Sequence, residues 1–327
     1  MGQPVIVQIE NIYYPILAVI GVPADLLTIV ILSRGRCGLS KCITHYLVAM
    51  AAADLLVLIF EVILYEIKDA YFSYSFLNYT PICRLNLSLL FVSIDCSVWL
   101  TVAFTFDRFV AICCQKFRTK YCTEKTAAVV IAVVFCLSVL QNVPIYFIYE
   151  PREIIDNEPW SCNVKSSFYF LPMWITLLWL ETILTPFVPF VLILLLNALT
   201  IRHIVMANKV RRVLRGNNNN ENDNDPEMVN RKKSIILLLA ISGSFILLWM
   251  VNFAFLICVQ FTDAKFLEAN YNGPFTIMEK SGYMLRCLSS CTNKFIYALS
   301  QSKFREELKD VIKSPLSLVT NLINSVK

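Results

Sequence analysis

The sequence has little charge, little glycine and almost no histidine. Only 16% of its 327 residues are charged, whereas soluble domains average about 25%. Its 8 glycines and 22 phenylalanines favour packed helices, and it lacks the alternating segments of about ten residues that a membrane β-barrel would need. Two histidines, His45 and His203, are too few for a histidine-based catalytic or metal centre. These shortages argue against an enzyme and favour a membrane protein with many spans.

Seven long apolar runs dominate a chain that is 57% hydrophobic. Each approaches the roughly 20 residues that a membrane-spanning helix requires. They cover residues 12–33, 43–65, 84–112, 126–149, 173–206, 233–261 and 275–299. The seventh is the weakest because it contains Glu279, Lys280 and Arg286. We predict an all-α seven-helix bundle over residues 12–299, after a short segment, 1–11, without the layout of a signal peptide.

Basic residues gather on one side of the predicted bundle. The 1–2, 3–4 and 5–6 connections and the segment 300–327 are rich in lysine and arginine, whereas the 2–3 and 4–5 connections are mixed or acidic. The positive-inside rule then predicts an extracellular N-terminus and a cytoplasmic C-terminus, in the plasma membrane. The net charge of +5 reflects this asymmetry, so we expect no nucleic-acid partner.

The predicted outer side holds two of the 12 cysteines, Cys83 and Cys162. Because that side is oxidising, we predict a disulfide between them, from the start of the third span to the 4–5 connection. The sequence "NYT" marks Asn78 as a glycosylation site on the same side, whereas "NLS" at Asn86 falls inside the third span and is discounted.

Two segments on the inner side have their own character. Residues 216–227, "GNNNNENDNDPE", form a polar insertion that composition predicts to be disordered. Residues 302–313 place Phe304, Leu308, Val311 and Ile312 on one helical face among lysines and arginines. This pattern predicts an amphipathic helix that binds the lipids of the inner leaflet.

A charged pair, Asp107-Arg108, interrupts the apolar end of the third run. Charged residues inside a span are costly and point to function, although a pair at a helix end can also snorkel to the interface. Arg108 lies about 25 residues, or roughly 38 Å of helix, beyond Cys83. The pair therefore belongs at the inner surface.

With this topology, the sequence "DRF" at 107–109 resembles the Asp-Arg-Tyr motif of the rhodopsin-like G-protein-coupled receptors, and the resemblance covers nearly the whole chain. In that family the arginine is restrained at rest and engages the G protein on activation. The resemblance implies a heterotrimeric G protein as partner, and it assigns Asp107, Arg108, Phe109, Asn197 and Tyr297 to coupling.

The same resemblance implies a polar network and a sodium ion at mid-membrane, around Asp54, Ser97 and Asn293. Several positions depart from the family pattern, and two of them lie in this network: Asp25 stands in place of an asparagine and Lys294 in place of a proline. Two close carboxylates resist joint ionisation. Our hypothesis is therefore that Lys294 offsets the charge of Asp25; the alternative is that Lys294 snorkels to the inner interface. We expect no other metal and no cofactor.

The outer halves of the spans carry more ionisable and aromatic residues than contact with lipid requires. Leu90 and Cys287 replace, respectively, the aspartate of amine receptors and the lysine of opsins, which disfavours both ligand types. Arg286 suits a ligand carboxylate, and Glu61 or Glu181 an ammonium group; the alternative is an internal Glu61–Arg286 ion pair. The expected ligand-binding residues are Glu61, Phe91, Asp95, Glu181, Trp249, Tyr283 and Arg286.

The stretches "AMAAADLLVL" and "NKFIYALSQSKFREELK" are similar to a branch of brain receptors proposed to sense L-tryptophan and L-phenylalanine through the Gq class. We therefore expect an aromatic amino acid or a related small zwitterion as agonist. The main alternative is a neuropeptide, because the branch stands near invertebrate neuropeptide receptors. A ligand-independent receptor remains a further alternative, and a transporter is disfavoured because the chain has no internal repeat.

Overall fold

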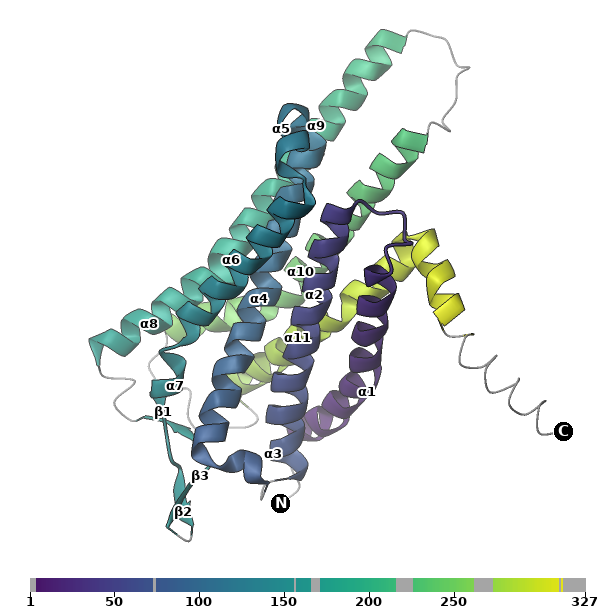
Figure 1. Ribbon diagram of the computed structural model, residues 1–327. Helices are drawn as coiled ribbons and strands as arrows, with labels where there is room; N and C mark the ends of the chain where they lie inside the picture. Colours follow the sequence, from purple (N-terminus) through teal and green to yellow (C-terminus); the bar gives the residue numbers. More distant parts are fainter. Residues whose placement is uncertain are drawn as a thin grey trace, which may run out of the picture.

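Seven long helical stretches carry the seven apolar runs in the computed structural model of the chain (Figure 1). The structure describes residues 4–72, 75–155, 157–165, 171–215, 226–261, 273–311 and 313. The stretches are α1 (Val5–Ser33); α2 (Lys41–Val57) continued by η1 (Leu58–Ile67) and α3 (Lys68–Tyr71); α4 (Thr80–Cys113); α6 (Glu124–Asn142) followed by α7 (Ile145–Ile148); α8 (Pro172–Thr182) continued by η4 (Ile183–Phe187) and α9 (Val188–Arg215); α10 (Pro226–Phe261); and α11 (Pro274–Ser300). They confirm the predicted seven-helix bundle.

Local sequence explains where several of these helices begin. Ser40 caps α2 because its side chain accepts a hydrogen bond from the backbone N–H of Ile43. Thr123 caps α6 in the same way, by accepting from the backbone N–H of Thr126. Proline lies in the first turn of α4, α8 and α11, where its missing N–H costs nothing. The first helix, α1, begins at Val5, before the predicted start of the first span at residue 12, so it includes most of the segment 1–11.

Six stretches are long and apolar enough to cross a membrane within the described residues, and α11 is the seventh by its place in the bundle. It packs most extensively against α10 and also against α1 and α2. Its charged residues lower its hydropathy, and the three basic side chains within it pair with carboxylates of α1, η1 and α2. Ion pairs with neighbouring helices therefore compensate the charges of α11, the least apolar of the predicted spans.

Two of the long helical stretches change to π-helical geometry over part of their length. η1 in the second stretch contains Glu61, and η4 in the fifth contains Pro186. Such bulges are common at functional sites because they redirect side chains. The sequence "TPFVPF" predicts a kink at Pro189; the irregular segment instead contains Pro186, and Pro189 lies in the first turn of α9.

The two ends of the bundle differ. Figure 1 shows α3 and the β2–β3 hairpin at one end, and α5 (Gln115–Tyr121) with the far end of α9 at the other. We call these the disulfide end and the Arg108 end. At the disulfide end, β1 (Tyr149–Glu150) pairs with β4 (Asn163–Val164), and β2 (Glu153–Ile155) pairs with β3 (Glu158–Trp160), both antiparallel.

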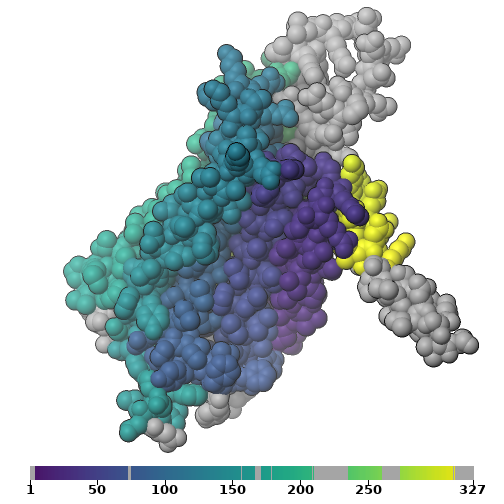
Figure 2. Space-filling model, viewed as in Figure 1, coloured from purple at the N-terminus to yellow at the C-terminus, as the bar shows by residue number. Residues whose placement is uncertain are grey.

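A helix over 302–311 follows α11 and turns alongside α1, as the yellow segment beside the purple one shows in Figure 2. Phe304 is 3% exposed and meets the ring of Tyr297 edge to face at 6.1 Å between centroids. Leu308 and Val311 also contact the core at the Arg108 end. Residue 312 and residues 314–327 lie outside the described residues, as do 216–225 of the predicted insertion.

Candidate functional site

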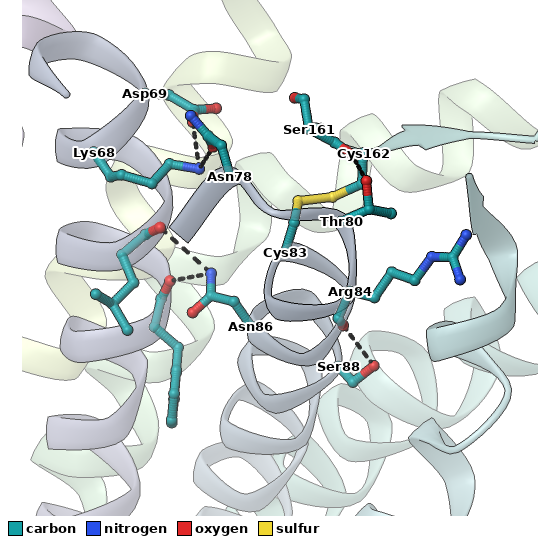
Figure 3. Close-up of a disulfide and its surroundings, with 12 residues drawn as sticks. Lys68, Asp69, Asn78, Thr80, Cys83, Arg84, Asn86, Ser88, Ser161 and Cys162 are labelled. Atoms are coloured by element: carbon teal, nitrogen blue, oxygen red, sulfur yellow. Dashed lines mark hydrogen bonds and ion pairs between the residues drawn. A yellow bond between two sulfur atoms is a disulfide. The ribbon is translucent and has the colours of Figure 1, made fainter. Parts of the chain in front are cut away.

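The disulfide end is held by the predicted bond between Cys83 and Cys162 (Figure 3). Cys83 lies in the first turn of α4, and the bond fastens the loop after β3 to it. Thr80 supports the same connection because its hydroxyl donates to the carbonyl of Ser161 at 2.7 Å. The prediction of this disulfide is therefore confirmed.

The predicted glycosylation site, Asn78, is buried in the folded structure. Asn78 is 5% exposed, and its Oδ1 accepts a hydrogen bond from Lys68 Nζ at 2.6 Å (Figure 3). Lys68 also contacts Asp69 at 2.7 Å. The glycan acceptor would be the amide nitrogen of this buried side chain, so glycosylation at Asn78 stays a prediction that burial in the folded structure disfavours.

Three predicted ligand-binding residues do come together between the second and seventh stretches. The Arg286 guanidinium donates to the carboxylate of Glu61, and both side chains are largely buried. Arg286 also lies over the ring of Tyr283, 4.8 Å from its centroid, and Tyr283 meets Phe255 edge to face. The internal ion pair that the sequence left as an alternative is thus formed.

Acidic groups outnumber cations around this pair. Lys280 of α11 contacts Glu10 of α1 at 3.2 Å, and Glu66 of η1 interacts electrostatically with Lys280 and Glu61. Tyr283 donates to Glu279 at 3.3 Å. Glu10 and Glu66 were not predicted as site residues, because Glu10 fell in the segment 1–11 and Glu66 at the edge of a span.

Asp95 lies deeper, where α4, α6 and η4 meet. It is 3% exposed and accepts hydrogen bonds from Asn142 Nδ2 at 2.5 Å and Thr185 Oγ1 at 2.6 Å. Glu181, partly exposed in α8, interacts electrostatically with both Asp95 and Arg286. Asn142 and Thr185 were missed, because amide and hydroxyl side chains in apolar runs carry no distinctive pattern.

The apolar members of the predicted ligand set lie in a cluster centred on α4 and α10. Trp249 is 5% exposed and stacks on Phe245 with 5.1 Å between ring centroids. Phe91 packs against the same cluster, which also contains Leu90. The predicted ligand set therefore divides into the Glu61–Arg286 pair, the Asp95 cluster and this aromatic wall, with Glu181 linking the first two.

The mid-membrane network forms with one exception to the expected chemistry. Asp54 is 1% exposed and accepts hydrogen bonds from Ser97 Oγ at 2.7 Å and Asn293 Nδ2 at 2.9 Å. Lys294 Nζ lies 2.7 Å from Asp25 and 4.0 Å from Asp54. A resident ammonium this close to both carboxylates does not fit a sodium ion, so these residues do not provide the site that the resemblance implies.

At the Arg108 end, Asp107 and Arg108 form an ion pair with both side chains buried, and Arg108 Nε lies 3.0 Å from Asp107 Oδ2. The thiol of Cys42 in α2 donates to Asp107 Oδ1 at 3.2 Å. Cys122, between α5 and α6, contacts the Asp107 carbonyl at 3.7 Å. Burial and the Asp107 carboxylate raise the pKa of the Cys122 thiol to about 11.

The other residues assigned to coupling surround the same end. Phe109 is half-buried and contacts Phe106, while Asn197 donates to Ser242 Oγ at 2.8 Å and ties α9 to α10. Tyr297 is 1% exposed beneath Phe304. The assigned side chains come from α4, α9 and α11, and Ser242 of α10 joins them through its contact with Asn197.

Comparison with known proteins agrees with this arrangement. Residues 24–297 match the family described as 7 transmembrane receptor (rhodopsin family), so the chain belongs to that family and is a multi-pass membrane protein. The family is one of receptors, in agreement with the prediction of a receptor rather than an enzyme.

Among individual proteins, the chain is similar to the FMRFamide receptor of Drosophila melanogaster. The two are 23% identical over 303 residues, which cover 89% of this chain and 51% of that receptor. The chain thus spans about half the length of this relative. The match supports the family, whereas the branch that senses aromatic amino acids stays a prediction.

Proposed function

We propose that the chain is a cell-surface G-protein-coupled receptor for a peptide with cationic and aromatic side chains and an amidated end. The disulfide end faces the outside and receives the peptide, and the Arg108 end faces the cytoplasm and couples to the G protein. The name of the Drosophila relative supports a peptide of this kind.

The pairing of Arg286 is the observation that carries the choice of ligand. A free amino acid needs a cation for its carboxylate, but Arg286 is already neutralised by Glu61 in a buried pair. An amidated peptide has no terminal carboxylate, so the pair need not break when it binds.

Glu181 is the carboxylate best placed to accept a cationic group of the ligand. It is partly exposed, and within the described residues it forms no ion pair. Asp95 beside it receives only neutral donors, Asn142 and Thr185, among the contacts described. A guanidinium from the ligand would offset this surplus of negative charge through a charge-assisted hydrogen bond.

An aromatic amino acid is the second candidate, and one observation favours it. Tyr283, with Phe255 on one side and Arg286 over its face, forms an aromatic surface beside a guanidinium. A small zwitterion binding there would have to displace Glu61 from Arg286. The two candidates thus differ in whether the Glu61–Arg286 pair stays closed.

Signal transfer follows from a shift between two populations of the bundle. An agonist that binds the active form more tightly favours that form. We propose that Arg108 then leaves Asp107 and, together with Asn197 and Tyr297, contacts the G protein. Coupling to the Gq class rests on the resemblance of "AMAAADLLVL" and "NKFIYALSQSKFREELK" alone.

The test is intracellular calcium in cells expressing the chain. They are treated with the amide Phe-Met-Arg-Phe-NH2, with its analogue that has neutral citrulline for arginine, and with L-tryptophan and L-phenylalanine. We expect the arginine peptide to be the most potent, and Glu181→Gln to lower its potency about tenfold while leaving the citrulline analogue unchanged. Glu153→Gln, an exposed carboxylate on β2, is the matched control. A response to the amino acids without one to the peptide would support the second candidate.

A further inference from the structure

Lys294 lies where three helices meet at the middle of the bundle. Its ammonium nitrogen is 2.7 Å from Asp25 of α1 and 4.0 Å from Asp54 of α2. All three side chains are 5% exposed or less. Buried charges persist in a protein only when paired, so this contact compensates groups that would otherwise be strongly destabilising.

The two carboxylates depend on Lys294 to different degrees. Asp54 also accepts hydrogen bonds from Ser97 and Asn293, one on each carboxylate oxygen. Asp25, by contrast, receives no hydrogen bond from any other side chain or backbone N–H in the part of the chain that the structure describes. Lys294 is therefore mainly the counter-ion of Asp25, and it interacts more weakly with Asp54.

From this geometry we infer that Lys294 is the resident cation of the Asp25–Asp54 site, so that the receptor neither binds nor responds to sodium there. A tethered ammonium does at this position what a diffusible monovalent cation would do, and it repels a second cation at contact distance. The inference does not depend on the identity of the ligand.

The position of Lys294 adds a mechanical consequence. Lysine, unlike proline, retains a backbone N–H, and α11 runs as one helix from Pro274 to Ser300. A sodium ion can leave a site when the bundle rearranges, but Lys294 cannot leave its chain. The ionic contact therefore ties α1 and α2 to α11 independently of the salt outside the cell.

Thermal unfolding of the purified chain in detergent tests the inference. Melting temperatures are compared in sodium chloride and in potassium chloride of equal concentration, so that ionic strength is held constant. We expect the wild-type melting temperature to be the same in the two salts within about 1 °C. A wild-type chain stabilised by sodium over potassium would overturn the inference.

Two variants establish whether Lys294 is the cause. The double variant Asp25→Asn/Lys294→Met leaves Asp54 with its neutral donors Ser97 and Asn293, and sodium should raise its melting temperature by about 2–4 °C. Lys294→Met alone retains both carboxylates and should respond at least as strongly. Adding Asp54→Asn to the double variant should abolish the sodium effect. If both lysine variants fold and ignore sodium, Lys294 is not what excludes the ion, and the inference fails.

Discussion

The guanidinium of Arg286 in α11 donates to the carboxylate of Glu61 in η1, across 225 positions of sequence. Two further cations of α11 repeat this relationship, because Lys280 contacts Glu10 and Lys294 contacts Asp25. Each of the three basic side chains of this span, the one with the lowest hydropathy, is thus paired with a carboxylate of a neighbouring helix. Its charged residues are part of the packing of the bundle as well as of the proposed site.

Arg286→Ala should strongly destabilise the bundle, because it leaves Glu61 buried without its partner. Breaking one side of a buried pair costs about 3–5 kcal/mol. The measurement is the melting temperature of the detergent-solubilised chain. Adding Glu61→Gln should recover much of the loss, and Lys280→Ala, whose side chain is 27% exposed, should cost less. If Arg286→Ala lowered the melting temperature equally with and without Glu61→Gln, the explanation by a buried ion pair would be contradicted.

Asp107→Asn should raise ligand-independent signalling, because it weakens the group that restrains Arg108. Losing about 1–2 kcal/mol of stabilisation of the resting form shifts the ratio of the two forms by about 5–30-fold. Basal second-messenger output, normalised to surface expression, measures the shift. Arg108→Ala is the contrasting variant and should lose both basal and stimulated output. Unchanged basal output in Asp107→Asn would show that the pair does not restrain the receptor.

The pH dependence of thiol alkylation should report on the neighbourhood of Asp107. The pKa of Cys122 is raised to about 11 by burial and by the Asp107 carboxylate. Only the thiolate reacts, so its alkylation rate should rise about tenfold for each unit between pH 8 and pH 10. The Cys122→Ser variant supplies the background from other cysteines. Asp107→Asn should speed the reaction at pH 8, since a neutral neighbour no longer disfavours the thiolate; an unaltered rate would count against the contact.

Cys83→Ser should lower surface expression and the melting temperature of what remains. The bond joins positions 79 residues apart, and a loop of that length corresponds to about 4 kcal/mol in the chain-entropy account. Cys162→Ser and the double variant should match the single variant, because one missing sulfur already opens the loop. A double variant much worse than either single one would indicate a separate role for one thiol.

The bundle was predictable because apolar runs and the distribution of basic residues are long-range, one-dimensional signals. The disulfide was predictable for a related reason, since two cysteines stood alone on one side. The partner of Lys294 was also foreseeable, because Asp25 and Lys294 depart together from the family pattern. For the disulfide and for Lys294, the sequence offered few other partners that the sulfur or the charge could reach.

The environment of Asn78 and the partners of Asp95 were not predictable. A sequon shows that a glycosylating enzyme could recognise three residues of the chain. It does not show that Asn78 will be buried and will accept a hydrogen bond from Lys68 in the folded chain. The neutral donors of Asp95 come from two other helices, and neither Asn142 nor Thr185 stands out from its apolar run. Contacts between helices depend on rotation and depth, which hydropathy does not specify.

Asp95→Asn separates a structural role for this carboxylate from a role in binding the ligand. An asparagine keeps the size and one acceptor oxygen; with that oxygen facing Nδ2 of Asn142, its own Nδ2 would face the Thr185 hydroxyl, which now donates to Asp95. We expect a modest fall in melting temperature, from weakening one or two buried hydrogen bonds at about 1–3 kcal/mol each. Glu181 is partly exposed, whereas Asp95 is buried. The potency of the arginine peptide should therefore change less in Asp95→Asn than in Glu181→Gln. The reverse order, measured by calcium release at matched surface expression, would place the ligand's cation deeper, at Asp95 itself.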